Sequence, residues 1–224
     1  MKQLTLSNGQ EVELKGTIAK KSTQDILTQV AKVPPVKKLD NVLVIMRDGS
    51  GSMRDKMDTN KTKAQIACEV IATELAPHMA GWEYGLLDFE SQVCWRIPPG
   101  SSIQLLTTLQ PMCEGGTSML KALRTVWQYL GINANKARII LLTDGFPTDS
   151  STEGILDASR DHKSIPIDTV GIGGMAGGAY DEKFLIALSE LTGGIFSKGH
   201  SVNELAKVML ELAPENRPLL GSPK

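Results

Sequence analysis

The chain has 224 residues and a mass of 24.2 kDa, so one domain with an extension is expected rather than two full domains. Its 24 Lys and Arg residues nearly balance 25 Asp and Glu residues, so the basic surplus typical of duplex-binding proteins is missing. Aromatic residues make up only 4%, too few for stacking platforms along a single strand, and no nucleic-acid partner is expected.

The first 40 residues differ from the rest of the chain. Apolar and polar residues alternate over residues 4–14 on both sides of Asn8-Gly9, a dipeptide that tolerates the positive φ angles of a tight hairpin turn. A short helix is expected over residues 23–32, because Pro34-Pro35 prevents its continuation. Residues 1–40 are therefore predicted to form an N-terminal extension made of a β-hairpin, a short helix and a Pro-Pro linker.

From residue 41 onward, short aliphatic runs alternate with helical patterns. Strands are predicted at residues 42–46, 84–89, 93–95, 139–142, 167–172 and 195–197. Helices are predicted at residues 61–77, 118–130 with a stop at Gly131, 152–162, 181–191 and from Ser201, where Ser201 and Glu204 form a capping box. This order predicts an α/β, Rossmann-like doubly wound fold whose mostly parallel sheet is covered by helices on both faces. The domain is expected to span residues 41–213, followed by a flexible tail over 214–224.

No segment of the sequence has the features of a membrane span or a secretion signal. The longest apolar runs are far too short to cross a bilayer, and residues 1–5 lack an apolar signal region. Three cysteines without Cys-x-x-Cys spacing fit neither a disulfide framework nor a zinc ribbon, so reduced and mostly buried thiols are expected. We therefore expect a cytoplasmic protein without a membrane partner.

Oxygen-bearing side chains follow two of the predicted strands. Asp48, Ser50 and Ser52 occupy alternate positions after the first strand of the domain, so they can point the same way from an extended loop. Thr117 stands just before a predicted helix, and Asp144 follows the strand at 139–142. Together they offer five oxygen groups and two formal negative charges without Cys or His, a set suited to Mg²⁺ or Mn²⁺ and unsuited to Zn²⁺. Ligands of doubly wound sheets bind beyond the carboxyl ends of the strands, which is where these residues are expected to lie.

This pattern resembles the metal-ion-dependent adhesion site of von Willebrand factor type A domains, which is Asp-x-Ser-x-Ser followed by a distant Thr and a distant Asp. The resemblance covers about residues 41–213 and all five site positions. It implies that Ser50, Ser52 and, in the partner-bound form, Thr117 contact the metal directly, while Asp48 and Asp144 act largely through waters. It also implies a non-enzymatic protein-interaction module whose partner supplies an Asp or Glu to the ion.

Some questions of function stay open at the sequence level. By family analogy, the partner could be an AAA+ ATPase or a component of a stress-resistance system. The site could instead be empty or purely structural, and a different class of function is a Mg²⁺-dependent phosphohydrolase that uses Asp48 as its nucleophile. Arg47 stands where the family usually has an aliphatic residue, and it could either turn to solvent or pair with a carboxylate and compete with the metal.

Overall fold

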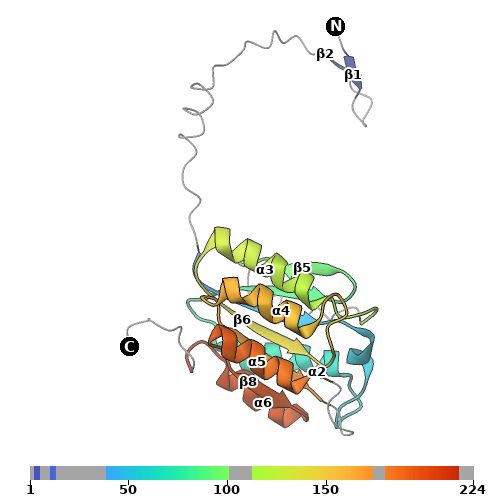
Figure 1. Cartoon of the computed structure of the whole chain (residues 1–224), viewed down its shortest axis with the longest axis vertical. Helices are drawn as coiled ribbons and strands as arrows, with labels where there is room; N and C mark the ends of the chain where they lie inside the picture. Colours follow the sequence, from blue (N-terminus) through green and yellow to red (C-terminus); the bar gives the residue numbers. More distant parts are fainter. Residues whose placement is uncertain (1–2, 6–10, 14–38, 101–112, 174–179, 217–224) are drawn as a thin grey trace. The chain divides into compact units, whose positions relative to one another are not determined.

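The computed structural model describes residues 3–5, 11–13, 39–100, 113–173 and 180–216 (Figure 1). The chain divides into two units, Met1–Val36 and Lys37–Lys224. In the first unit, strands β1 (Gln3–Thr5) and β2 (Glu11–Glu13) pair in antiparallel orientation. The turn predicted at Asn8-Gly9 and the helix predicted at 23–32 lie outside the described residues.

A six-stranded sheet forms the centre of the second unit. Its strands are β3 (Leu39–Asp48), β4 (Glu83–Phe89), β5 (Val93–Ile97), β6 (Ala134–Thr143), β7 (Ile167–Ile172) and β8 (Phe196–Gly199). They lie in the order β5-β4-β3-β6-β7-β8, and β5 alone among them runs antiparallel to its neighbour. The two central strands, β3 and β6, carry unbroken apolar runs at residues 42–46 and 139–142 because both faces of the sheet are buried there.

Helices cover both faces of this sheet. The helices are α2 (Lys63–Val70), α3 (Met119–Asn133), α4 (Thr152–Ser159), α5 (Glu182–Thr192) and α6 (Val202–Glu211). One core contains Leu43 and Ile45 of β3 with buried residues of α2 and α6, and the other contains Val42 and Val44 with residues of α3, α4 and α5. Figure 1 shows α3, α4 and α5 lying one after another in front of the sheet. The predicted doubly wound α/β architecture is therefore confirmed.

In two of the predicted helices, the last part is not α-helical but forms shorter helical segments of other types. The π-helical segment η2 (Ile71–Leu75) and the 3-10 segment η3 (Ala76–His78) follow α2, so that the helical stretch predicted at 61–77 is broken into three types of turn. Segment η5 (Arg160–His162) follows α4 in the same way. One further 3-10 segment, η1 (Gly51–Arg54), lies in the loop after β3.

Several element ends differ from the predicted ones; strand β6, for example, begins at Ala134 instead of residue 139. Helix α3 passes through Gly131 and ends at Asn133, although a glycine inside a helix costs roughly 1 kcal/mol. Strand β3 begins at Leu39, inside the predicted extension, and pairs there with Ala134 of β6.

A glycine pair, Gly193-Gly194, follows the end of α5. Gly193 has φ +75° at the end of this helix, a left-handed conformation that favours glycine. A Cβ on Gly194 would lie 1.9 Å from the carbonyl oxygen of Ile167, so this glycine allows the backbone to approach β7 closely.

The cysteines only partly match their expected burial. Cys68 on α2 is buried and Cys113 is half-buried, but Cys94 on β5 is exposed. The expectation of mostly buried thiols is therefore wrong for Cys94, because β5 is an edge strand with one open side.

Candidate metal centre

The candidate site lies where the strand order of the sheet reverses. Strands β3 and β6 are neighbours at the centre of the sheet, although β4 and β5 come between them in the sequence. The parallel register pairs Arg47 with Leu142, so the next residues, Asp48 and Thr143, reach the same edge of the sheet. Asp144 follows directly. Ligands of doubly wound sheets bind at such a switch point, beyond the carboxyl ends of the strands.

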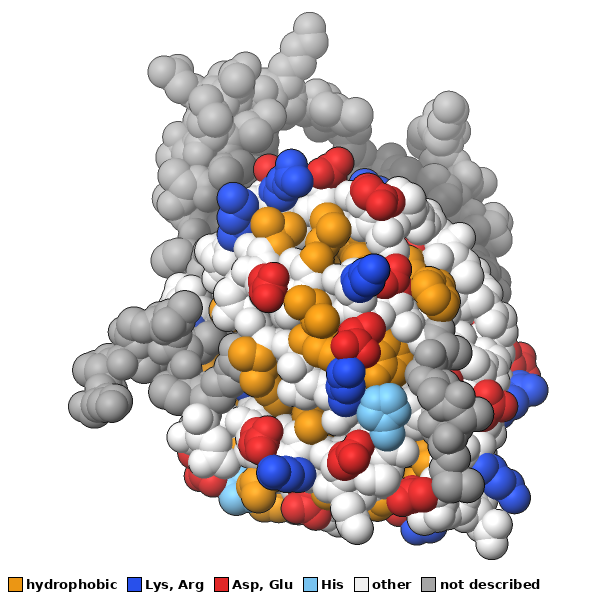
Figure 2. All heavy atoms as spheres, turned by 60° about the horizontal axis from the view of Figure 1, so that its bottom comes forward, with side chains coloured by type: hydrophobic (Ala, Val, Ile, Leu, Met, Phe, Trp, Pro, Cys, Tyr) orange, Lys and Arg blue, Asp and Glu red, His pale blue; other side chains and the backbone are white. Residues whose placement is uncertain are grey.

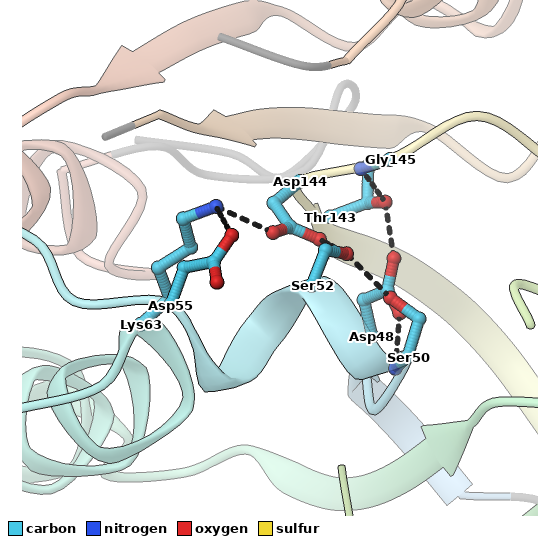
Figure 3. A network of polar contacts seen from close by, with 8 residues as sticks. All are labelled: Asp48, Ser50, Ser52, Asp55, Lys63, Thr143, Asp144 and Gly145. Atoms are coloured by element: carbon cyan, nitrogen blue, oxygen red, sulfur yellow. Dashed lines mark hydrogen bonds and ion pairs between the residues drawn. The ribbon is translucent and has the colours of Figure 1, made fainter. Parts of the chain in front are cut away.

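Asp48 is fully buried and both of its carboxylate oxygens accept hydrogen bonds. Oδ1 accepts from the backbone N–H of Ser50 at 2.7 Å, and Oδ2 accepts from Oγ1 of Thr143 at 2.5 Å (Figure 3). Burial raises the pKa of Asp48 to about 6, while the hydrogen bonds from Thr143 and Ser50 act in the opposite direction and the nearby charge of Asp144 adds to the increase.

Hydrogen bonds connect Asp48 to Asp144 through two serines. Oγ of Ser52 donates to Oδ1 of Asp144 at 2.7 Å, and it lies 3.0 Å from Oγ of Ser50. Because Ser52 uses its single hydroxyl hydrogen on Asp144, Ser50 is the donor of the bond between the two serines. Four of the five predicted site residues therefore form one hydrogen-bonded group, which Figure 3 shows at the ends of the strands.

Thr117, the fifth predicted residue, borders the same space. A Cβ built on Gly145 would lie 3.5 Å from Oγ1 of Thr117 and 3.9 Å from Oγ of Ser52. The backbone of Thr117 is held by Thr148, whose Oγ1 accepts from the N–H of Thr117 and whose own N–H donates to the Thr117 carbonyl, both at 2.9 Å. Thr148, which sequence reasoning missed, thus ties the Thr117 loop to the loop that follows β6.

Backbone hydrogen bonds also join the Thr117 loop to the loop after β3. The N–H of Glu114 donates to the carbonyl of Gly49 at 2.8 Å, and the N–H of Gly51 donates to the carbonyl of Gly115 at 3.3 Å. Three chain segments that are far apart in the sequence are therefore fixed relative to one another around the predicted site.

Lys63 is a site residue that sequence reasoning missed. The residue is 5% exposed, and its Nζ donates to Oδ2 of Asp144 at 2.7 Å. The sequence signal that could have located it is the capping box of Thr62 and Gln65, whose reciprocal hydrogen bonds fix Lys63 as the first residue of α2.

Arg47 does not turn to solvent, and it does not contact Asp48. Its guanidinium is buried, and it donates to both carboxylate oxygens of Asp88 on β4, at 2.8 and 3.0 Å. A third nitrogen donates to Sγ of Cys68 on α2. Alternate residues of a strand point to opposite faces, so Arg47 lies on the α2 side of β3 and Asp48 on the other. Arg47 was expected either to turn to solvent or to pair with a carboxylate, and the structure shows the second. The carboxylate is that of Asp88, which is not one of the predicted metal ligands.

The donor chemistry fits a hard divalent cation. The described residues contain no group of three or more His, Cys, Asp or Glu side chains that could hold a metal ion. The predicted site has two carboxylates and three hydroxyls instead, which is an oxygen-only set of low charge. An ion held there would depend on the hydroxyls of Ser50, Ser52 and Thr117 as much as on the carboxylates.

Beside the site, one large apolar side chain is open to solvent. Phe146, two residues after Asp144, is 55% exposed. A pocket of about 500 Å³ lies elsewhere, at the amino end of β6, where Leu130, Ile165 and Gly193 help to line it. It contains none of the predicted site residues.

Comparisons with known proteins support the fold of the second unit. Two family models, each described as a von Willebrand factor type A domain, match residues 43–146 and 102–197. No curated protein matches the chain.

Several solved structures share the fold at low sequence identity. The ArnB paralog VWA2 from Sulfolobus acidocaldarius is 21% identical, with a TM-score of 0.61 over 80% of this chain and 46% of that protein. An aerotolerance-related membrane protein from Bacteroides fragilis is 17% identical, with a TM-score of 0.60 over 75% of this chain and 96% of that one. The PilB minor pilin from Streptococcus sanguinis is 14% identical, with a TM-score of 0.63 over 83% and 64% of the two chains. Taken together, the two family models and the shared fold identify residues 43–197 as part of a von Willebrand factor type A domain.

Proposed function

We propose that this protein is a metal-dependent protein-interaction module that binds a carboxylate of its partner through Mg²⁺ or Mn²⁺. Domains of this family commonly mediate protein–protein interaction and are generally not enzymes. The observation that carries the proposal is the meeting of two buried carboxylates and three hydroxyls at the switch point of the sheet.

The proposed ligands have distinct tasks. Ser50, Ser52 and Thr117 would offer neutral hydroxyl oxygens to the ion, while Asp48 and Asp144 would supply the negative charge around it. Neutral ligands leave a divalent ion short of negative charge, so an Asp or Glu from another protein is a strong additional ligand. The ion would supply this electrostatic attraction, and the hydrogen bonds of Thr148 and Thr143 would hold Thr117 and Asp48 in place.

The geometry gives no support to a phosphohydrolase. A nucleophilic carboxylate must present an oxygen to the phosphorus atom, but Asp48 is fully buried and both of its oxygens accept hydrogen bonds from the protein. The second position after it is Ser50, whose hydroxyl cannot act as a general acid or base near neutral pH. We therefore keep the non-enzymatic function as the proposal.

An AAA+ ATPase or a component of a stress-resistance system is the proposed partner class, by family analogy, and a cytoplasmic location is proposed. None of the helices in the described residues has the length and apolar composition needed to cross a membrane. On the face that carries α6 and β8, acidic and basic side chains are mixed between hydrophobic ones, which supports the proposed absence of a nucleic-acid partner (Figure 2).

Metal binding is tested with a double variant of the two serines. Ser50→Ala combined with Ser52→Ala should weaken Mg²⁺ and Mn²⁺ binding at least about tenfold in calorimetry, because two hydroxyl ligands are lost. The circular dichroism spectrum should stay unchanged. Ser164→Ala with Ser197→Ala is the control, since it removes two hydroxyls outside the site. Equal metal affinity of the wild type and the site variant would remove the basis of the proposal.

Partner binding is tested by affinity purification with Mg²⁺ and with a chelator. Thr117→Ala should reduce partner recovery more than it reduces metal affinity, since Thr117 is expected to join the ion mainly in the partner-bound arrangement. Recovery of the same proteins by both forms, with and without metal, would mean that recognition does not use this site.

A further inference from the structure

Lys63 occupies a position that is unfavourable for its charge. It is the first residue of α2, and the positive end of a helix dipole repels a cation at its amino terminus. It is also 5% exposed, and burying an ammonium group is costly unless the group is paired. A compensating interaction must therefore hold Lys63 in place.

That interaction is the ion pair with Asp144. The Nζ atom of Lys63 lies 2.7 Å from Oδ2 of Asp144, a carboxylate with no exposed surface, and 3.8 Å from Oδ2 of Asp55, whose side chain is 72% exposed. Because the other oxygen of Asp144 accepts from Ser52, both oxygens of this carboxylate have protein donors. Figure 3 shows Lys63 and Ser52 reaching Asp144 from its two sides.

The pair changes the charge of the site. Asp48 and Asp144 contribute two formal negative charges when both are ionised, and the buried ammonium of Lys63 neutralises one of them. Asp55 is largely in water, where its charge is screened and adds little. A divalent cation entering the site therefore meets a net charge of about −1 instead of −2. It also has to compete with the ammonium group of Lys63 for the carboxylate of Asp144.

We propose that Lys63 is an internal counter-cation that competes with the divalent metal for Asp144 and thereby lowers the metal affinity of the site. This inference rests on the proposed function, because it assigns a regulatory role within the same metal centre. In the absence of metal, the ammonium keeps the buried Asp144 charge paired. With metal bound, the site carries a surplus positive charge, which a carboxylate from a partner would neutralise.

The experiment is a calorimetric titration of the full chain with MgCl₂ and with MnCl₂. Lys63→Met should tighten metal binding by roughly tenfold or more, because it removes a buried positive charge near the ion. Lys63→Gln should act in the same direction, and its amide can still donate a hydrogen bond to Asp144, which guards against misfolding. Lys61→Met is the matched control: it removes the same charge two residues away, from an exposed lysine that pairs with Glu69, and should change the affinity less than about twofold.

A second readout is the melting temperature in the presence of chelator and of Mg²⁺. With chelator, Lys63→Met should melt below the wild type, because the buried Asp144 charge loses its partner, and Mg²⁺ should raise its melting temperature more than it raises that of the wild type. Equal metal affinities of the folded Lys63 variants and the wild type would overturn this inference and leave the proposed function standing, as would weaker binding by those variants. Absence of metal binding in the wild type and in every variant would overturn both.

Discussion

Two buried basic residues near the ends of β3 and β6 differ in role because they contact different carboxylates. Arg47 pairs with Asp88, which is a neighbour in the sheet and lies outside the predicted ligand set. Lys63 pairs with Asp144, which is a predicted ligand. Only the second cation is therefore expected to affect metal affinity. Arg47 is expected to contribute to stability instead, by linking β3, β4 and α2 inside the core.

This separation of roles leads to a prediction for Arg47→Met. Removing one partner of a buried ion pair leaves an uncompensated charge, so the free energy of unfolding should fall by about 3–5 kcal/mol in urea denaturation. The lower end is expected, because Arg96 lies 3.5 Å from Asp88 and can partly replace Arg47. Metal affinity, where the fold is intact, should stay within about twofold of the wild type.

The control for this prediction replaces both partners. Arg47→Met combined with Asp88→Leu removes the pair without leaving a buried charge, so most of the lost stability should return. A double variant that is less stable than Arg47→Met alone would show that Asp88 stabilises the fold through other contacts, such as the one with Arg96.

At the level of elements, the start of α3 depends on a residue from another loop. Ser118, the residue before the helix, makes no capping hydrogen bond with its side chain. Instead, the carboxylate of Asp149 accepts from the N–H groups of Leu120 and Lys121, at 3.2 and 2.8 Å. The helix that follows Thr117 is thus capped from the loop after β6, which also supplies Asp144 and Thr148.

We expect Asp149→Ala to destabilise the protein by about 1–2 kcal/mol, because two N–H groups at the positive end of α3 lose a charged acceptor. Urea denaturation monitored by tryptophan fluorescence measures this change. Asp157→Ala removes a carboxylate on α4 that is 70% exposed and forms an ion pair with Arg160 of η5, and it should change stability by less than about 0.5 kcal/mol. Equal effects of the two substitutions would contradict the capping role.

The same elements explain how much of the site could be predicted from sequence. Asp48 and Asp144 each follow an aliphatic strand, and because parallel strands end at one edge of the sheet, their proximity could be predicted from the pattern. The contact of Lys63 with Asp144 could not be predicted in this way, because Lys63 stands at the start of a helix and does not follow a strand of the sheet. Its place on the first turn of a helix is typical of a solvated residue, and only the packed structure shows that it is buried. The partner of Arg47 was missed because Asp88 lies beside it only through the pairing of β3 with β4, a strand order that the sequence pattern does not give.

At the level of the whole molecule, the fold and the site belong to the second unit of the chain. All the predicted ligands and the residues that hold them lie between Asp48 and Asp149, within Lys37–Lys224. The predicted boundary at residue 40 divides β3, however. Leu39 pairs with Ala134 of β6 and packs against the core that contains α3, and Asp40 accepts a hydrogen bond from the side chain of Asn135 at 2.9 Å.

Two truncations that differ by four residues test this boundary. A chain that begins at Lys37 should melt within about 1 °C of the full protein and bind metal equally well, because β3 is intact. A chain that begins at Asn41 should lose the packing of Leu39 and the hydrogen bond of Asp40, about 1–3 kcal/mol, and melt lower by roughly 2–8 °C. Differential scanning calorimetry with chelator present separates this effect from metal binding. If the chain that begins at Lys37 is insoluble while the full protein is not, the extension must cover an apolar face or an edge of the sheet, and it is then part of the fold.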